Sequence, residues 1–345
     1  MLSFLAFLIA CFGLVLAFFP LILPRFGVSW SFYFKEWRAG TGALAVLFLI
    51  FGFLLESVSV PFIVLTIFVL ALFSIFRPHT AIRALSLPLK EPADSQIPEE
   101  DFVMGITMKD FSCAYPMKQM VIPRHIVNDK IADEPLVITY CAACRSGIAY
   151  KAFVNNRSFI FEAAGMHRRN LTLRDQQTRS IWQQDTGICL YGPLKGARLE
   201  FFPSEQMTWK AWKEEHPQTV IAVEPVNAPK SIFSNDIMYR LFIKATDGIK
   251  WVSRFLHYDR RLAANAMVAA VQINGIVKAY PLEILEKEGM IKDMIGNTSM
   301  TVSFDKNTRA MTAQENDTGI SIPVFLEWWH GWSEFHPNTE IYKNA

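Results

Sequence analysis

The stretch WKAWKEEHPQT at residues 209–219 returns at residues 329–339 as WHGWSEFHPNT. Two tryptophans, a histidine, a proline and a threonine keep the same order and the same spacing in both places. Rare residue types that recur at fixed spacing are the sequence signature of an internal repeat. The chain is therefore predicted to contain two copies of one folding unit.

A second matched region precedes the tryptophan motif in each copy. CAYP at 113–116 is followed by VNDKI at 127–131 and LVITY at 136–140, and KAYP at 278–281 is followed by IKDMI at 291–295 and MTVSF at 300–304. Apolar runs at 103–108 and 267–273 predict an opening strand, the proline suits the first turn of a helix, and a second strand follows an aspartate-containing turn. These patterns predict an α+β domain with a largely antiparallel sheet and an imperfect internal duplication.

The two copies differ in length. Trp209 follows Cys141 by 68 positions, whereas Trp329 follows Asp305 by only 24. We assign the extra 44 residues, the CxxC motif among them, to an insertion in the first copy, and expect the second copy to be mainly structural. Alternating segments at 148–154 and 158–162, joined by NNR at 155–157, predict a hairpin in this region.

The first 76 residues are far more apolar than the rest of the chain. Segments at about 2–23, 41–56 and 58–76 predict three transmembrane helices, because about 20 apolar residues cross a bilayer core. A cleaved signal peptide is the alternative for the first segment. The sequence thus predicts an integral, multi-pass membrane protein, with flanking lysines and arginines that favour a cytoplasmic soluble domain.

The remaining chain is divided by composition and by the repeat. We expect a linker at 77–101, the first repeat at 102–224, a connecting segment at 225–264 and the second, shorter repeat at 265–345. A formal net charge of +2 without a dense lysine and arginine cluster argues against a nucleic-acid partner. The expected partners are membrane lipid and an unknown redox or protein partner.

Five cysteines occur in the chain, and only Cys141 and Cys144 form a recognisable pair, CAAC. Two thiols at this spacing can cycle between dithiol and disulfide, bind a soft metal, or pack as small apolar side chains. In the redox interpretation Arg145 stabilises the thiolate, and no cofactor is predicted. In the metal interpretation zinc or copper needs further ligands, for which the candidates are Cys113, Cys189, His125 and His167.

Polar and aromatic residues are concentrated near positions 167–194. They can be interpreted as the lining of a ligand pocket, or as tight turns held by side-chain hydrogen bonds with the tryptophan in the core. His216 and His336 recur at equivalent positions, so we interpret them as packing or capping residues, because a catalytic residue need not be duplicated. The pocket candidates are His167, Arg174, Asp175, Trp182 and Gln184.

Four longer motifs extend this pattern: YCxxCxSGxAY from Tyr140, LxxRDxxTxSxWxQ from Leu171, GPLxGxxL from Gly192, and the first tryptophan motif. With them the chain, from about Val103 to Tyr342, resembles an uncharacterised family known as domain of unknown function 3179, which includes selenoprotein members. Selenocysteine in relatives implies redox chemistry, since a selenol offers more to thiol exchange than to a structural position. The resemblance therefore implies a redox role for Cys141 and Cys144, and an exported domain.

Overall fold

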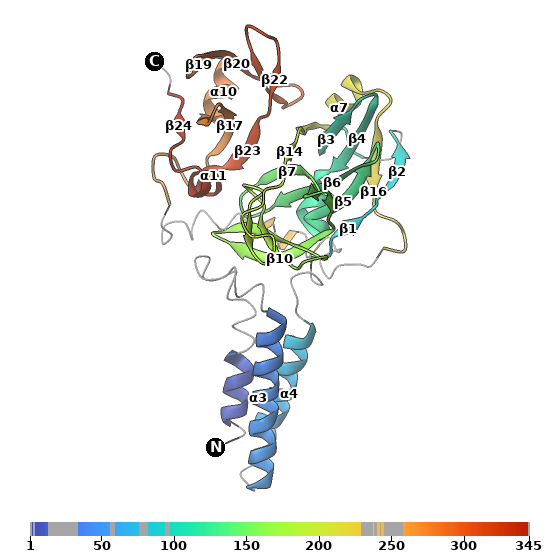
Figure 1. The fold of residues 1–345 in the computed structure, drawn as a ribbon, viewed down its shortest axis with the longest axis vertical. Coiled ribbons are helices and arrows are strands. Elements are labelled where there is room, and N and C mark those ends of the chain that lie inside the picture. The colour runs from blue at the N-terminus through green and yellow to red at the C-terminus, as the bar shows by residue number, and fades with distance from the viewer. Residues whose placement is uncertain are drawn as a thin grey trace.

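The computed structural model describes residues 2, 4–12, 34–55, 59–75, 82–93, 97–228 and 258–343, with five isolated positions between 237 and 244. The long helices of the N-terminal region lie at one end of the molecule, and small, mainly antiparallel sheets with short helices form the body at the other end (Figure 1). Most of the predicted connecting segment at 225–264 lies outside the described residues.

The first copy consists of two five-stranded sheets. One has the order β15-β3-β4-β16-β2, formed by Glu205–Thr208, Phe102–Met108, Phe111–Pro116, Val220–Val223 and Leu89–Pro92. The other has the order β1-β5-β6-β7-β14, formed by Leu85–Ser86, Ile126–Ile131, Glu134–Cys141, Ser146–Lys151 and Phe201–Phe202. The short helical segments α6 (Met117–Gln119) and η1 (Met120–Arg124) join them, and α7 (Trp209–Glu215) follows β15.

The second copy repeats the order of this arrangement with four strands in each sheet, since it has no counterpart of β2 or β1 within the described residues. Its first sheet, β23-β17-β18-β24, is formed by Phe325–Trp328, Met267–Ile273, Ile276–Pro281 and Glu340–Ile341. Its second sheet, β19-β20-β21-β22, is formed by Met290–Ile295, Thr298–Phe304, Met311–Glu315 and Ser321–Ile322. The helix α10 (Leu282–Glu288) takes the place of α6 and η1, and α11 (Trp329–Phe335) that of α7.

The insertion lies between β7 and β14 and forms the hairpin β8-β9 and the sheet β10-β11-β12-β13. Only residues 316–320 separate the equivalent strands β21 and β22. The CxxC motif is outside this insertion, because it forms the turn between β6 and β7, and its counterpart is the turn after Phe304. The predicted hairpin is present with shorter strands. The strands of the insertion, β8 to β13 in order, are Phe153–Val154, Arg157–Ser158, Phe161–His167, Asn170–Asp175, Ile181–Gln183 and Cys189–Tyr191.

An aspartate that is buried in the first copy and partly buried in the second occupies the same place in each copy. Asp129 lies on β5 and accepts a hydrogen bond from the Tyr115 hydroxyl over 2.5 Å, and Lys90 forms an ion pair with it. The segments 127–131 and 291–295 are therefore strands and not the predicted turns, since their aspartates point into the fold. Residues 77–101 are not only a linker, because Lys90 belongs to β2, which pairs with β16.

In the second copy the same aspartate arrangement takes its lysine from a different strand. Tyr280 donates to Asp293 over 2.8 Å, and Lys278 lies 2.6 Å from the same carboxylate. Lys278 stands where the first copy has Cys113, which cannot carry a positive charge. Each copy therefore neutralises a partly buried carboxylate with one lysine, as its burial requires.

The two copies face each other through reciprocal contacts. The backbone N–H of Trp328 donates to the carbonyl of Cys144 over 2.8 Å, and that of Thr208 donates to the carbonyl of Thr308 over 3.1 Å. The two donors are equivalent, because Thr208 and Trp328 each come directly before the tryptophan motif of their copy. The two acceptors are also equivalent, because Cys144 lies four positions after Tyr140 and Thr308 lies four positions after Phe304. Contacts that are exchanged in this way define an isologous, pseudo-twofold interface.

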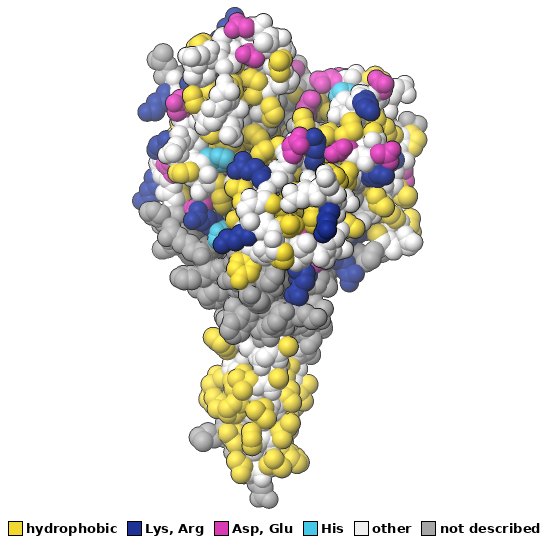
Figure 2. All heavy atoms as spheres, viewed as in Figure 1, with side chains coloured by type: hydrophobic (Ala, Val, Ile, Leu, Met, Phe, Trp, Pro, Cys, Tyr) yellow, Lys and Arg dark blue, Asp and Glu magenta, His cyan; other side chains and the backbone are white. Residues whose placement is uncertain are grey.

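The apolar N-terminal region contains α3 (Phe34–Leu54) and α4 (Val60–Ile75), whose outer side chains are largely hydrophobic (Figure 2). No helix within the described ranges is long and apolar enough to cross a membrane. α4 has 16 residues, or about 24 Å at the helical rise, and the first five residues of α3 include three charged ones. A bilayer core is about 30 Å thick. The prediction of an integral, multi-pass membrane protein is therefore wrong for these two helices, and residues 13–23 of the first predicted span lie outside the described residues.

Candidate functional site

Cys141 and Cys144 lie in the tight turn that joins β6 to β7. The backbone N–H of Cys144 donates to the carbonyl of Cys141 over 3.3 Å, which closes a four-residue turn. The Cα atoms at the ends of such a turn are less than about 7 Å apart, a separation that a disulfide can bridge. Both cysteines are free thiols, and their exposed fractions are only 2% and 0%.

The insertion covers one side of this turn. The backbone N–H of Leu171 donates to the sulfur of Cys141. The sulfur of Cys144 lies 3.3 Å from the carbonyl oxygen of Arg169 and 3.7 Å from the amide nitrogen of Asn170. These three residues follow one another at the β10-β11 turn, so a single short segment reaches both sulfurs.

The second copy covers the other side. Beside the Trp328 contact, the ring nitrogen Nε2 of His330 donates to the carbonyl of Ala143 over 3.0 Å. Gly331 lets α11 approach closely, because a methyl group there would lie 2.9 Å from Cβ and 3.0 Å from Sγ of Cys144. The expectation that the second copy is mainly structural is therefore wrong for the surroundings of the thiols.

A buried carboxyl group, that of Glu327, lies next to Cys144, and a second, that of Asp185, lies next to Glu327. Glu327 on β23 and Asp185 after β12 are 1% and 2% exposed. Asp185 accepts a hydrogen bond over 3.1 Å from Nε2 of His336, whose side chain reaches the surface. Among the described residues no N–H group donates to Oδ1 of Asp185 or to either oxygen of Glu327. Glu327 is hydrogen-bonded to Asp185, and the proton shared between the two carboxyl groups satisfies one oxygen of each.

The surroundings give the two thiols opposite properties. Burial raises the pKa of Cys141, but hydrogen bonds from the Cys144 thiol and from three backbone N–H groups outweigh it and lower that pKa below its usual value. Burial and the hydrogen bond to Cys141 raise the pKa of Cys144 well above its usual range. Burial and the nearby charge of Asp185 likewise raise the pKa of Glu327. Cys141 is thus the more acidic thiol of the pair, whereas the surroundings of Cys144 and Glu327 favour their protonated forms.

A network of buried amides holds the cysteine turn in place. Nε2 of Gln184 donates to Oγ1 of Thr139 over 3.2 Å and to the carbonyl of Ser146 over 3.3 Å. The amide of Asn170 donates to Oε1 of Gln184 over 2.8 Å. Because Thr139 and Ser146 stand on either side of the turn, Gln184 positions the strands that carry the thiols.

The other pocket candidates lie in the insertion and hold its turns. Arg174 forms an ion pair with Glu162. Asp175 accepts hydrogen bonds from the Thr178 hydroxyl over 2.8 Å and from the indole N–H of Trp182 over 2.9 Å, and Trp182 is fully buried. None of the five predicted pocket residues lines either of the two cavities described below.

Arg145 follows Cys144 with a left-handed backbone, at φ 56°. Its guanidinium lies 5.2 Å from the centre of the Trp328 ring, a distance typical of a cation–π contact. The groups that lower the pKa of Cys141 are the neighbouring thiol and backbone N–H groups. A role of Arg145 in stabilising the thiolate therefore stays a prediction.

The further metal ligands suggested by the sequence lie apart. No three His, Cys, Asp or Glu side chains form a metal-binding group in the part of the chain that the structure describes. Burial raises the pKa of Cys113 to about 11, which disfavours the thiolate that a metal needs. Cys189 lies 3.5 Å from the carbonyl of Tyr191, His125 contacts the carbonyl of Met120, and His167 ends β10.

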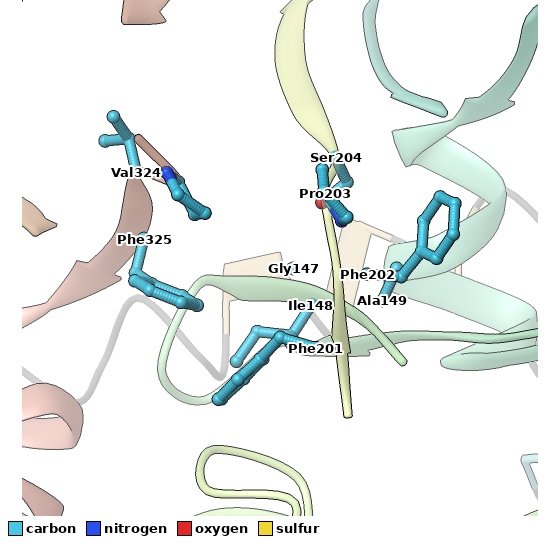
Figure 3. A pocket seen from close by; sticks show the side chains of 10 residues that line it. Gly147, Ile148, Ala149, Phe201, Phe202, Pro203, Ser204, Val324 and Phe325 are labelled. Carbon is cyan, nitrogen blue, oxygen red and sulfur yellow. The ribbon is translucent and has the colours of Figure 1, made fainter. Parts of the chain in front are cut away.

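A small apolar cavity of about 50 Å³ lies between the two copies (Figure 3). β7 and β14 line it on one side and β23 on the other, and the rings of Phe201 and Phe325 meet edge to face at 5.2 Å. This volume holds a few water molecules and is far below that of an organic ligand site.

Sequence reasoning missed the residues that reach the thiols from outside the CxxC motif. Leu171 began a quoted motif and Asn170 preceded it, but neither was connected to the cysteines. Glu327 is an acidic residue in the apolar run VFLEWW, and Gly331 is a glycine inside a helix, where it costs stability. An acidic residue in an apolar strand and a glycine within a helix are both unusual in sequence, and these two signals could have pointed to the site.

His125 is a buried histidine away from the thiols, and its protonation can be tested through the stability of the protein. His125 is buried in a left-handed conformation with φ 52°, Nδ1 donates to the carbonyl of Met120 over 3.0 Å, and burial lowers its pKa to about 4. The unfolded state therefore binds one more proton between pH 6.5 and 4, so stability falls as the pH drops through this range. Asparagine tolerates the same backbone and can donate the same bond.

We expect His125→Asn to reduce the slope of unfolding free energy against pH by about 1.4 kcal/mol per pH unit near pH 5, the value for one proton. Urea unfolding at several pH values measures the slope. His330 also has its pKa lowered to about 4 by burial, so part of the slope remains. An unchanged slope in the variant would contradict the assignment of His125.

The comparisons with known proteins give one match. A family model described as protein of unknown function (DUF3179) matches residues 82–339, which include β1 and β2, both copies and the insertion. No curated protein and no solved structure matches the chain. Since the match covers well over half of the sequence, the chain belongs to the DUF3179 family of proteins of unknown function.

Proposed function

We propose that the protein is a thiol–disulfide oxidoreductase in which Cys141 is the nucleophile and Cys144 the resolving thiol. The observation that supports it is the unequal treatment of the two sulfurs: three backbone N–H groups and a thiol donate to Cys141, while Cys144 keeps its proton beside a buried carboxyl group. A thiolate is the reactive form in disulfide exchange. Two inert structural thiols need no such difference.

The oxidant in the proposed reaction is a disulfide of a partner molecule. The Cys141 thiolate attacks one sulfur of that disulfide, which forms a mixed disulfide and releases one thiolate. Cys144 then loses its proton and attacks the sulfur of Cys141, which closes the Cys141–Cys144 disulfide and releases the second thiolate. The enzyme loses two electrons and the partner disulfide gains them. Because both sulfurs are buried, the proposed partner is a small disulfide.

The buried carboxyl groups supply a route for the Cys144 proton. Glu327 takes that proton on one oxygen while it passes its own proton to Asp185. Asp185 is hydrogen-bonded to His336 at the surface, so charge leaves the closed site without an unpaired buried thiolate. In this role His336 does more than cap its helix.

Redox titration tests the proposal. The full chain is equilibrated with mixtures of reduced and oxidised dithiothreitol, quenched with acid, unfolded and alkylated, and the free thiols are counted by mass spectrometry. We expect Cys141 and Cys144 to be oxidised and reduced together and reversibly, and expect Cys141→Ser and Cys144→Ser each to abolish this transition. Cys113→Ser, which changes a buried cysteine of β4, is the matched control and should leave it intact. A pair that stays reduced at every ratio would overturn the proposal.

A further inference from the structure

A second, larger cavity of about 400 Å³ lies between the two copies. Its volume falls within the range of small-molecule sites in proteins, about 300–1,000 Å³. It lies at the interface of two folded units, a place where such sites are common. Fourteen residues line it, eight from the first copy and six from the second.

Equivalent residues of the two copies line this cavity. Arg145 and Arg309 occupy equivalent positions, five residues after Tyr140 and Phe304, and all four residues line the cavity. The two arginines share the same left-handed backbone, with φ 56° and 55°. This conformation costs a residue with a side chain about 1 kcal/mol or more, so glycine or asparagine suits it better. The presence of arginine in both copies indicates a use for the side chain.

The two walls have different chemistry. The wall from the first copy carries hydrogen-bonding groups, among them Tyr140 and Gln206, whereas the wall from the second copy has Phe304 and Leu326 at the equivalent places. Three lining residues are cationic, namely Lys118, Arg145 and Arg309, and only Asp101 is anionic. The lining thus carries more cations than anions, with hydrogen-bonding groups on the wall from the first copy and mainly apolar side chains on the wall from the second, where Arg309 also lies 3.7 Å from Glu286.

We propose that this cavity binds an amphipathic organic anion, a carboxylate with an aliphatic body. Arginine pairs with carboxylates through two parallel hydrogen bonds, and amide and phenol groups add donors on the same wall. The apolar wall of Leu326, Phe304 and Met267 buries the aliphatic part. This site is separate from the proposed redox reaction, since neither cysteine lines the cavity.

Calorimetric titration of the full chain with decanoate tests the site, with decanol as the neutral ligand of the same length. We expect one decanoate per chain and at least tenfold weaker binding of decanol. Arg309→Gln removes one charge, and Leu326→Gln copies the polar residue of the first copy onto the apolar wall. Each should weaken decanoate binding about tenfold. Arg157→Gln, on the exposed β8-β9 hairpin, is the matched control and should bind as the parent does.

Two further variants separate this proposal from structural damage and from the redox proposal. Arg309→Lys keeps the charge and should retain most of the affinity if the site requires a cation, and near-ultraviolet circular dichroism checks the fold of every variant. Cys141→Ser should bind decanoate normally even where redox activity is lost. Equal affinity for decanol, or parental decanoate affinity in both Arg309→Gln and Leu326→Gln, would overturn the proposal.

Discussion

Replacement of Trp212 by alanine is expected to lower the free energy of unfolding by about 3–5 kcal/mol, the usual cost of deleting a buried tryptophan. Trp212 is fully buried, and its indole N–H donates to the Thr219 hydroxyl over 2.8 Å. Its ring lies directly against Gly105, where even a methyl group would overlap the indole. Since the surrounding sheet cannot collapse into the space, the cavity persists. Urea unfolding followed by circular dichroism measures the loss.

Two other variants show whether the tryptophan motif does the same in both copies. Trp332 is 2% exposed and donates to Thr339 over 3.0 Å, so Trp332→Ala should cause a loss of similar size. Thr219→Val removes only the hydrogen bond and should cost about 1 kcal/mol. A loss below 1 kcal/mol in both tryptophan variants would show that the repeated motif is not the core of each copy.

Replacement of Glu327 by methionine is expected to stabilise the protein by about 1–3 kcal/mol at neutral pH and to slow disulfide formation at the Cys141–Cys144 pair. Methionine is what the first copy carries at the equivalent position, Met207 on β15, where it is buried without a partner charge. The variant removes a buried carboxyl group next to Cys144 and Asp185. It also removes the proposed proton acceptor.

The raised pKa of Glu327 determines how the stability gain of the methionine variant changes with pH. The pKa of Glu327 is raised well above its usual 4.5 in the folded protein, so the folded state holds a proton that the unfolded state has released. Stability of the parent therefore falls as the pH rises above about 4.5, and the advantage of the variant grows over the same range. Urea unfolding at pH 4 and pH 7 measures both proteins.

Glu327→Gln separates shape from proton transfer. Glutamine keeps the volume and can donate to Asp185, but it cannot accept the proton of Cys144. Stopped-flow oxidation by a small disulfide should be slow in both variants. An unchanged rate in both would remove Glu327 from the proposed mechanism and leave the reversible oxidation of the cysteines as a separate question.

The sequence predicted much of the fold because the repeat is a local pattern. The opening strand at 267–273, the helices that begin after Tyr-Pro and the helical tryptophan motif all depend on neighbours within a few positions. The errors arose where a local pattern was insufficient. Asp129 and Asp293 suggest turns by composition, yet each lies in a strand because a tyrosine and a lysine from other strands satisfy it. The insertion was counted at the correct length but placed too early, since length alone does not locate a boundary.

By itself, the sequence determined that this protein has two unequal copies of one unit and a cysteine pair in the first, since rare residues at fixed spacing survive in the linear order. Only the tertiary structure decided what surrounds that pair. Arg169 lies 25 positions from Cys144, and His330 lies 187 positions from Ala143 in the same turn; His330 reaches the turn because the copies pack face to face. Hydrogen bonds and burial across such separations depend on packing, which no local pattern records.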